Sequence, residues 1–270
     1  MSARAPGARL DVRALSKTYV FGGEALPTLE RVELTAHAGE FIALIGPSGC
    51  GKSTLFRILA GLESPGSGEV LIDGAPLARR LGAFAFMPQR DALLEWRRMI
   101  DNVTIGLEVA GVRRAAARAQ AAPLIERFGL GGFETAWPWQ LSGGMRHRAA
   151  FLRTVLLGKP AMLLDEPFGS LDGITRSELQ QWLLEVWGEV GSTVMLITHD
   201  VAEAVFLADR VYVMTPRPGR IATVIEIDLP RPRTLAIEES PAFGALEARV
   251  REALRTAAAP ALAARGLRRD

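Results

Sequence analysis

The chain has 270 residues, of which 49% are hydrophobic and 23% are charged, which is the profile of a globular protein with ample material for a buried core. Acidic and basic residues nearly balance at a formal net charge of +2, and no long basic stripe accompanies the pI near 9.0, so nucleic acid is not an expected partner. A single cysteine excludes an intrachain disulfide, and no apolar run is long enough to cross a bilayer.

The first part of the chain has the pattern of strands separated by turns. Apolar and polar residues alternate over residues 10–16 and 32–36, which predicts half-buried strands. The wholly apolar run at residues 41–45 predicts a strand that is buried on both faces. Further elements expected in this part are a helix at residues 52–61 and strands at residues 69–72 and 83–87.

A helical stretch from about Asp101 to about Leu157 then separates two parts with strand-like runs. After it, strands are expected at residues 161–164, 193–197 and 210–214, with helices at residues 176–190 and 201–208. Strands that alternate with helices imply right-handed crossovers and a largely parallel sheet, so the predicted fold class is α/β. The residues from about 230 onward mix prolines and arginines before a predicted amphipathic helix at residues 242–258.

The strongest local signal lies between the buried strand at 41–45 and the helix that begins at Lys52, and it fits the phosphate-loop pattern in full. Its glycines let backbone N–H groups turn toward phosphate oxygens, and the N-terminus of the helix adds positive potential. Lys52 is expected to reach the β- and γ-phosphates, and Ser53 to ligate Mg²⁺. The nucleotide-binding residues predicted here are Gly46, Pro47, Ser48, Gly49, Cys50, Gly51, Lys52, Ser53 and Thr54.

Two acidic residues, Asp165 and Glu166, stand at the end of the apolar strand at 161–164. In phosphoryl-transfer enzymes with a phosphate loop, one such aspartate holds Mg²⁺, often through water. The neighbouring glutamate is placed to orient or polarise an attacking water. Together with the phosphate loop, this pair predicts hydrolysis of a nucleotide.

Between these two sites, Leu141-Ser142-Gly143-Gly144-Met145 matches the signature motif of ABC ATPases, and the chain resembles that family. Other phosphate-loop families lack this element. The segment has the pattern of a helix N-terminus with Ser142 as cap and two glycine amides, which suits an anion. The resemblance implies that Ser142, Gly143 and Gly144 bind the γ-phosphate held by an opposite subunit, so that the site is completed only in a dimer.

Further positions match the motifs of the family in the expected order. Tyr19 resembles the aromatic residue that stacks on adenine, and the alternative is a strand aromatic packed in the core. Gln89 resembles the Q-loop glutamine, which contacts Mg²⁺ or water and senses the membrane partner. Ser170-Leu171-Asp172 resembles the D-loop, which crosses the dimer interface. His199, at the end of an apolar strand, resembles the switch histidine that contacts the γ-phosphate.

Two further positions carry expectations of their own. His147 follows the signature motif where family members usually have glutamine, and a histidine there adds a group that titrates near the expected dimer interface. Cys50 lies inside the phosphate loop, so thiol reagents are expected to block nucleotide binding.

The resemblance implies an α/β fold with a phosphate-loop NTPase core of ABC type, in which a mainly parallel sheet is accompanied by an antiparallel β part. The expected ATPase domain is residues 1–229, with a helical subdomain inserted at about 90–158, and a C-terminal extension, helical in part, is expected at 230–270. The expected ligands are ATP and Mg²⁺. The predicted catalytic residues are Lys52, Gln89, Glu166 and His199, and the predicted metal-binding residues are Ser53, Gln89 and Asp165.

The resemblance also implies partners and a location. These are a second ATPase subunit, identical or closely related, separate transmembrane permease subunits and, indirectly, a periplasmic or extracellular substrate-binding protein. Such a chain would be a bacterial peripheral protein on the cytoplasmic face of the inner membrane. Contact with the membrane chains is expected near residues 90–102, where Leu93, Leu94 and Trp96 either receive a short helix of the permease or belong to the local core.

Within the family, the runs at residues 87–91, 96–97 and 101–103 resemble the importer group for nitrate, sulfonate and taurine, which includes relatives that handle thiamine precursors. An alternative is the ATPase of an exporter or a lipid-extraction complex. A third reading, an ABC ATPase that acts on DNA or ribosomes, is disfavoured because the chain carries one motif set and a short separation between Ser53 and Leu141.

Overall fold

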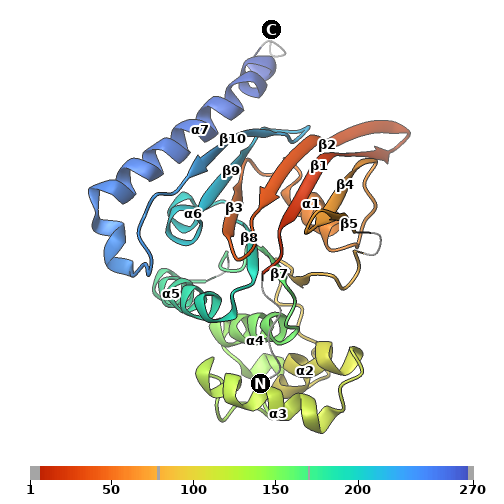
Figure 1. Ribbon diagram of the computed structural model, residues 1–270, viewed down its shortest axis with the longest axis vertical. Helices are drawn as coiled ribbons and strands as arrows, with labels where there is room; N and C mark the ends of the chain where they lie inside the picture. Colours follow the sequence, from red (N-terminus) through yellow and green to blue (C-terminus); the bar gives the residue numbers. More distant parts are fainter. Residues whose placement is uncertain (1–6, 78–79, 170, 267–270) are drawn as a thin grey trace.

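The computed structural model describes residues 7–77, 80–169 and 171–266, and its centre is a six-stranded sheet (Figure 1). The strand order is β10-β9-β3-β8-β7-β6. The strands from β9 to β6 run parallel, whereas β10 pairs antiparallel with β9 at one edge. The strands are β3 (Phe41–Ile45), β6 (Ala85–Met87), β7 (Ala161–Asp165), β8 (Thr193–Ile197), β9 (Arg210–Met214) and β10 (Ile221–Glu226).

A second sheet is antiparallel and has the strand order β2-β1-β4-β5. Buried residues of this sheet, such as Leu15, share one hydrophobic core with Phe56 of the first helix and with Leu44 of β3. The helix that follows the phosphate loop is therefore packed against both sheets. The elements are β1 (Leu10–Phe21), β2 (Glu24–Ala36), β4 (Ser67–Ile72), β5 (Ala75–Pro76) and α1 (Lys52–Leu59).

The opposite face of the six-stranded sheet supports the larger hydrophobic core. Successive side chains of a strand point to opposite faces, so β3 contributes Ile42 and Leu44 to one core and Phe41, Ala43 and Ile45 to the other. Because every residue of β3 is buried, its sequence shows no alternation. The helices on this face are α5 (Gly173–Val190), α6 (Val201–Leu207) and α7 (Pro241–Gly266).

Three helices form a lobe at the end of the molecule opposite to α7 (Figure 1). They are α2 (Met99–Val109), α3 (Arg114–Arg127) and α4 (Gly143–Leu156), with a short 3-10 turn at Pro138–Gln140 before α4. The chain enters this lobe after β6 and leaves it before β7. It is therefore an insertion between two neighbouring parallel strands, as the sequence predicts.

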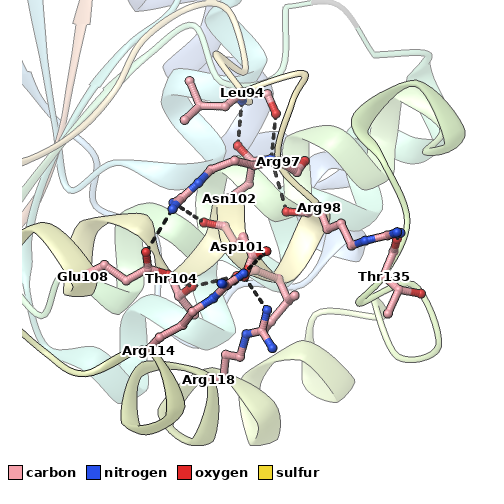
Figure 2. A network of polar contacts seen from close by, with 11 residues as sticks. Leu94, Arg97, Arg98, Asp101, Asn102, Thr104, Glu108, Arg114, Arg118 and Thr135 are labelled. Carbon is pink, nitrogen blue, oxygen red and sulfur yellow. Dashed lines mark hydrogen bonds and ion pairs between the residues drawn. The ribbon is translucent and has the colours of Figure 1, made fainter.

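A polar network fixes the segment that enters the lobe (Figure 2). The side chain of Asn102 is fully buried; it accepts a bond from the backbone N–H of Leu94 over 2.6 Å and donates to the carbonyl oxygens of Leu94 and Arg97 over 3.0 and 2.9 Å. Asp101 is paired with Arg114 and Arg118, each at 2.6 Å. These bonds join the loop after β6 to α2 and α3.

The α/β fold class is confirmed, and some boundaries differ from the sequence-based expectation. The strand expected at 10–16 continues to Phe21, because it pairs with β2 as far as the pair Phe21 and Glu24. Strand β10 was not predicted; it is an edge strand whose residues are mostly exposed, so it lacks a strong apolar pattern. Among the described residues, no helix is long and apolar enough to span a membrane. The domain boundary near residue 229 stays a prediction.

Candidate functional site

The phosphate loop joins the carboxyl end of β3 to α1. Gly49 and Gly51 have φ values of +75° and +109°, a backbone region that other residues rarely adopt. A side chain at Gly51 would also place its Cβ 2.6 Å from Leu29, whereas nothing lies within 4 Å of the Cβ position at Gly49. The loop is thus tightly packed against Leu29 at Gly51, whereas the space beside Gly49 is open and leaves room for an anion against the backbone.

Lys52 is buried, and its ammonium group points back along the same loop. Nζ donates to the carbonyl oxygens of Gly46 and Pro47 over 2.7 and 3.2 Å. A buried cation beside the open part of a glycine-rich loop is suited to binding phosphate oxygens. Cys50 is buried next to it, and burial raises the pKa of the Cys50 thiol above its ordinary value.

Ser53 and Asp165 meet across the edge of the sheet. The hydroxyl of Ser53 donates to Oδ1 of Asp165 over 3.3 Å, although the two residues come from α1 and from the end of β7. Hydroxyl and carboxylate oxygens are ligands that Mg²⁺ accepts, usually together with phosphate oxygens and waters. Among the described residues, no group of three or more aspartate, glutamate, histidine or cysteine side chains is arranged to hold a metal ion by itself. The residues present therefore fit Mg²⁺ bound to a nucleotide.

Glu166 is the point where three loops meet. Its Oε2 accepts a hydrogen bond from Nε2 of Gln89 over 2.9 Å and lies 3.4 Å from Nδ1 of His199. Gln89 follows β6 and His199 follows β8, so the carboxyl ends of parallel strands bring these groups together. Glu166 has a φ of +48°, which costs free energy in a residue other than glycine and is common at functional sites.

Burial changes the ionisation of two acids near this point. It raises the pKa of Asp165, while the hydroxyl of Ser53 acts in the opposite direction. Burial, with a smaller effect of Asp200, raises the pKa of Glu203 to about 8. Glu203 lies with Glu166 and His199 around one small pocket. Sequence analysis did not identify Glu203, although an aspartate cap at Asp200 followed by glutamate at position three is a recognisable helix-start pattern.

Tyr19 lies on β1 and is half-buried, so it is not a core residue. Its hydroxyl group donates to Glu63, and the ammonium group of Lys17 stands 5.1 Å from the centre of the ring. Burial raises the pKa of Tyr19 and the bond to Glu63 adds to this rise, while the hydroxyl of Thr54 in the phosphate loop acts in the opposite direction. The ring is therefore close to the phosphate loop and partly exposed, as an adenine-stacking residue needs to be.

The signature segment lies in the helical lobe. Ser142 caps α4, and its hydroxyl accepts a hydrogen bond from the backbone N–H of Met145 over 3.2 Å. Ser142 and Gly143 are exposed, and Gly144 is half-exposed. Within the described part of the chain, no hydrogen bond connects these three residues to the phosphate loop. His147 is buried, and its Nδ1 lies 3.3 Å from the carbonyl oxygen of Gly143. It therefore supports the signature turn from the buried side of α4.

Asp172 caps α5 by accepting a bond from the backbone N–H of Thr175 over 3.0 Å, and this bond lowers the pKa of Asp172. It is exposed near Ile174, which is 77% exposed at the start of the same helix. Ser170, part of the predicted D-loop, lies outside the described residues.

The structure thus divides the predicted site residues into two groups. The first group surrounds the phosphate loop and the ends of β6, β7 and β8, and it comprises Tyr19, residues 46–54, Gln89, Asp165, Glu166 and His199. The second group, Ser142, Gly143, Gly144 and Asp172, lies at the exposed N-terminal ends of α4 and α5. One subunit does not bring the second group onto its own phosphate loop.

Comparisons with known proteins agree with this geometry. A family model described as ABC transporter matches residues 29–169. An uncharacterized ABC transporter ATP-binding protein from Methanocaldococcus jannaschii is 44% identical over 225 residues, which is 83% of this chain and 84% of that protein. The taurine import ATP-binding protein TauB from Chromobacterium violaceum is 42% identical over 231 residues, which is 84% of this chain and 88% of that protein.

Two solved structures have the same fold. A dimeric bacterial ABC transporter cassette aligns with a TM-score of 0.72 at 29% identity and covers 82% of this chain and 99% of its own. A dimeric post-hydrolysis cassette bound to ADP and Pi aligns with a TM-score of 0.73 at 28% identity, with the same coverage. The phosphate loop, the acidic strand end, the signature segment and these likenesses agree. The chain therefore belongs to the ABC transporter family, as an ATP-binding subunit that hydrolyses ATP with Mg²⁺ as cofactor, and it is similar to taurine import ATP-binding proteins.

Proposed function

We propose that this chain drives substrate import through separate membrane subunits, and that the two groups of site residues form a composite ATP site across a dimer of this chain. The observation that carries the proposal is the separation within one subunit of the phosphate loop from the exposed signature segment. A second copy in head-to-tail orientation supplies the missing half to each site. The dimeric cassettes of the family support this arrangement.

In the proposed mechanism, the chain acts mainly by positioning groups and neutralising charge. Lys52 and the amides of the phosphate loop bind the β- and γ-phosphates. Ser53 and Asp165 hold Mg²⁺, which withdraws charge from the phosphate oxygens when it is bound. Glu166 orients the attacking water and accepts its proton. Gln89 and His199, which both contact the carboxylate of Glu166, keep it aimed at that water.

Tyr19 is proposed to stack on the adenine ring, with Glu63 holding its hydroxyl group. Ser142, Gly143, Gly144 and Asp172 of one subunit are proposed to complete the site of the other. The amides at the start of α4 and the helix dipole favour the γ-phosphate there.

Contact with the membrane subunits is proposed at the segment after Gln89. Leu93 is buried and belongs to the local core, Leu94 is half-buried, and Trp96 is 74% exposed. Trp96 is therefore the large apolar side chain of this segment that is free to enter a neighbouring protein. With this contact, the chain is proposed to lie on the cytoplasmic face of a bacterial inner membrane, beside a permease that receives cargo from a substrate-binding protein.

The hydrolytic proposal is tested with Glu166→Gln. We expect kcat to fall about a thousandfold, because a general base of this kind contributes about 10²–10⁴ in rate. ATP binding should persist, and the variant should accumulate an ATP-dependent dimer in light scattering. Glu226→Gln, an exposed carboxylate on β10, is the matched control and should behave as wild type. Normal turnover by Glu166→Gln would show that another group orients the water.

The import proposal is tested in the source organism by deleting the coding sequence and measuring uptake of labelled taurine, alkanesulfonates and nitrate. We expect uptake of one of these to be lost, and to return with the wild-type chain but not with Glu166→Gln. Retained uptake of all three, with loss of export or of lipid transfer instead, would overturn the import assignment in favour of an exporter.

A further inference from the structure

The loop after Gln89 is attached directly to the signature helix α4. Oδ2 of Asp91 accepts a bond from Nε of Arg146 over 3.2 Å, and Nη1 of the same arginine donates to the carbonyl oxygen of Leu141 over 2.8 Å. Leu141 immediately precedes Ser142, the cap of α4. One guanidinium group therefore joins the loop that carries Gln89 to the residue that begins the signature segment.

A second arginine of α4 supports the same loop. Arg153 is half-buried and donates to the carbonyl oxygens of Asp91 and Ala92 over 2.6 and 2.8 Å. Ala92 has a φ of +47°, so the turn it forms is strained and needs such support. Oδ1 of Asp91 also accepts a bond from the backbone N–H of Leu93 over 3.3 Å, which sets the orientation of its carboxylate.

These bonds complete a path through one subunit. Glu166 is bonded to Gln89, and Gln89 is two residues from Asp91. Asp91 is bonded to Arg146, and Arg146 to Leu141. The side chains of Arg146 and Asp91 are 36% and 28% exposed, and ion pairs this accessible contribute little to folding stability. The pair is therefore better suited to setting the position of two loops than to holding the fold together.

We propose that Asp91 and Arg146 are positioning residues that link the Gln89 loop to the signature loop of the same subunit, so that nucleotide at the phosphate loop of one subunit adjusts the signature segment it offers to its partner. The proposal rests on the composite site proposed above. It deepens that proposal by naming the bonds through which the two nucleotide sites of a dimer influence each other. Loss of the link leaves both half-sites intact but uncoordinated.

The test compares amide hydrogen exchange at residues 138–146 with and without Mg²⁺ and the non-hydrolysable ATP analogue AMP-PNP. Protein concentration is kept where light scattering gives the monomer mass, so that any change arises within one subunit. In wild type we expect nucleotide to change exchange in this segment about threefold or more. Asp91→Asn keeps the shape of the side chain. In this variant the nucleotide-dependent change in exchange should be less than half of that in wild type, and the dissociation constant of AMP-PNP should be unchanged.

Arg146→Gln breaks the link from the other side and should give the same result, which covers the case in which Asp91→Asn folds poorly. The matched control is Arg148→Gln, another arginine of α4 that pairs with Glu178 at 3.8 Å instead of with the Gln89 loop, and it should keep the full nucleotide-dependent change. In steady-state assays, Asp91→Asn and Arg146→Gln should each lower kcat about threefold with little effect on KM. The double variant should be no worse than either single one.

The link is refuted if the nucleotide-dependent exchange at residues 138–146 is the same in Asp91→Asn or Arg146→Gln as in wild type, or if wild type binds AMP-PNP without any change there. Failure of wild type to bind AMP-PNP at all would instead contradict the proposed nucleotide site. Equal loss in Arg148→Gln would show that general loosening of α4, not the Asp91–Arg146 bond, causes the effect.

Discussion

The amide group of Gln89 donates a hydrogen bond to Oε2 of Glu166 over 2.9 Å, although the two residues are 77 positions apart in the chain. Since β6 and β7 are parallel neighbours, the residues that follow them leave the sheet at the same edge. The same oxygen of Glu166 lies 3.4 Å from His199, which follows β8. The carboxylate is thus held by the loops of both neighbouring strands, as the proposed role of Glu166 in orienting water requires.

Gln89→Ala removes one of these two contacts. We expect kcat to fall about tenfold with KM for ATP changed by less than about twofold, because the orientation of Glu166 matters in the chemical step and not in nucleotide binding. Steady-state ATP hydrolysis measures both constants. Gln120→Ala, at an exposed position on α3, is the control. A large rise in KM with kcat preserved would show that Gln89 binds nucleotide directly instead.

Tyr19→Ala should raise the dissociation constant of MgATP up to about tenfold, because an aromatic stack contributes about 0.5–1.5 kcal/mol beyond burial. Tyr19→Phe keeps the ring and loses only the bond to Glu63, so its affinity should stay close to that of wild type. Isothermal titration calorimetry with MgATP distinguishes the two variants. If Tyr19→Ala binds normally, the adenine ring lies elsewhere.

Ser53→Ala should raise the Mg²⁺ concentration needed for half-maximal hydrolysis about tenfold, because the proposed metal ligand and a hydrogen bond to Asp165 are lost together. Ser67→Ala changes an exposed hydroxyl on β4, outside the phosphate loop, and serves as the matched control. Activity is measured over a Mg²⁺ titration at constant ATP. An identical Mg²⁺ requirement in both variants would contradict the role of Ser53.

Cys50 should react slowly with iodoacetamide in the folded chain. The side chain is 1% exposed, and burial raises the pKa of its thiol, so at pH 7 the rate should be at least about tenfold below that of free cysteine and should still be rising above pH 9. Mass spectrometry gives the rate. Once alkylated, the chain should no longer bind ATP, because the added group lies inside the phosphate loop. Unaltered affinity after complete alkylation would defeat this expectation.

Glu203 should make folding stability depend on pH. Its pKa is raised from 4.5 to about 8 in the folded chain by burial and then by Asp200. Below pH 4.5 it is protonated in both states, so its stabilising contribution is fully present there, and this contribution is lost as the pH rises toward 8. Between these pH values, the unfolding free energy of wild type should fall by about 4 kcal/mol relative to that of Glu203→Gln, whose side chain is neutral throughout.

Urea unfolding at several pH values measures the difference between wild type and Glu203→Gln. Glu226→Gln, with an exposed carboxylate, should track wild type across the range. Parallel curves for wild type and Glu203→Gln would mean that Glu203 ionises in the folded chain near its ordinary pKa.

Much of this protein follows from local sequence. The apolar runs that become β3, β7 and β8, the glycines of the phosphate loop and the serine cap of α4 each depend on neighbours within a few positions, so periodicity and backbone preference suffice to predict them. The α/β fold class was predicted on that basis, whereas the ABC family was predicted from the resemblance of the signature segment and other motifs; both predictions are confirmed. The roles of individual site residues stay predictions.

Contacts between distant segments required the tertiary structure. No local pattern distinguishes Leu93, which is buried, from Trp96, which is exposed, because the bonds of Asn102 to the segment decide how it lies on α2. In the same way, only the parallel order of β6, β7 and β8 brings Gln89 and His199 to Glu166. The sequence determined which chemical groups are available, and the packing of strands and helices decided which of them touch, since hydrogen bonds and burial act through space and not along the chain.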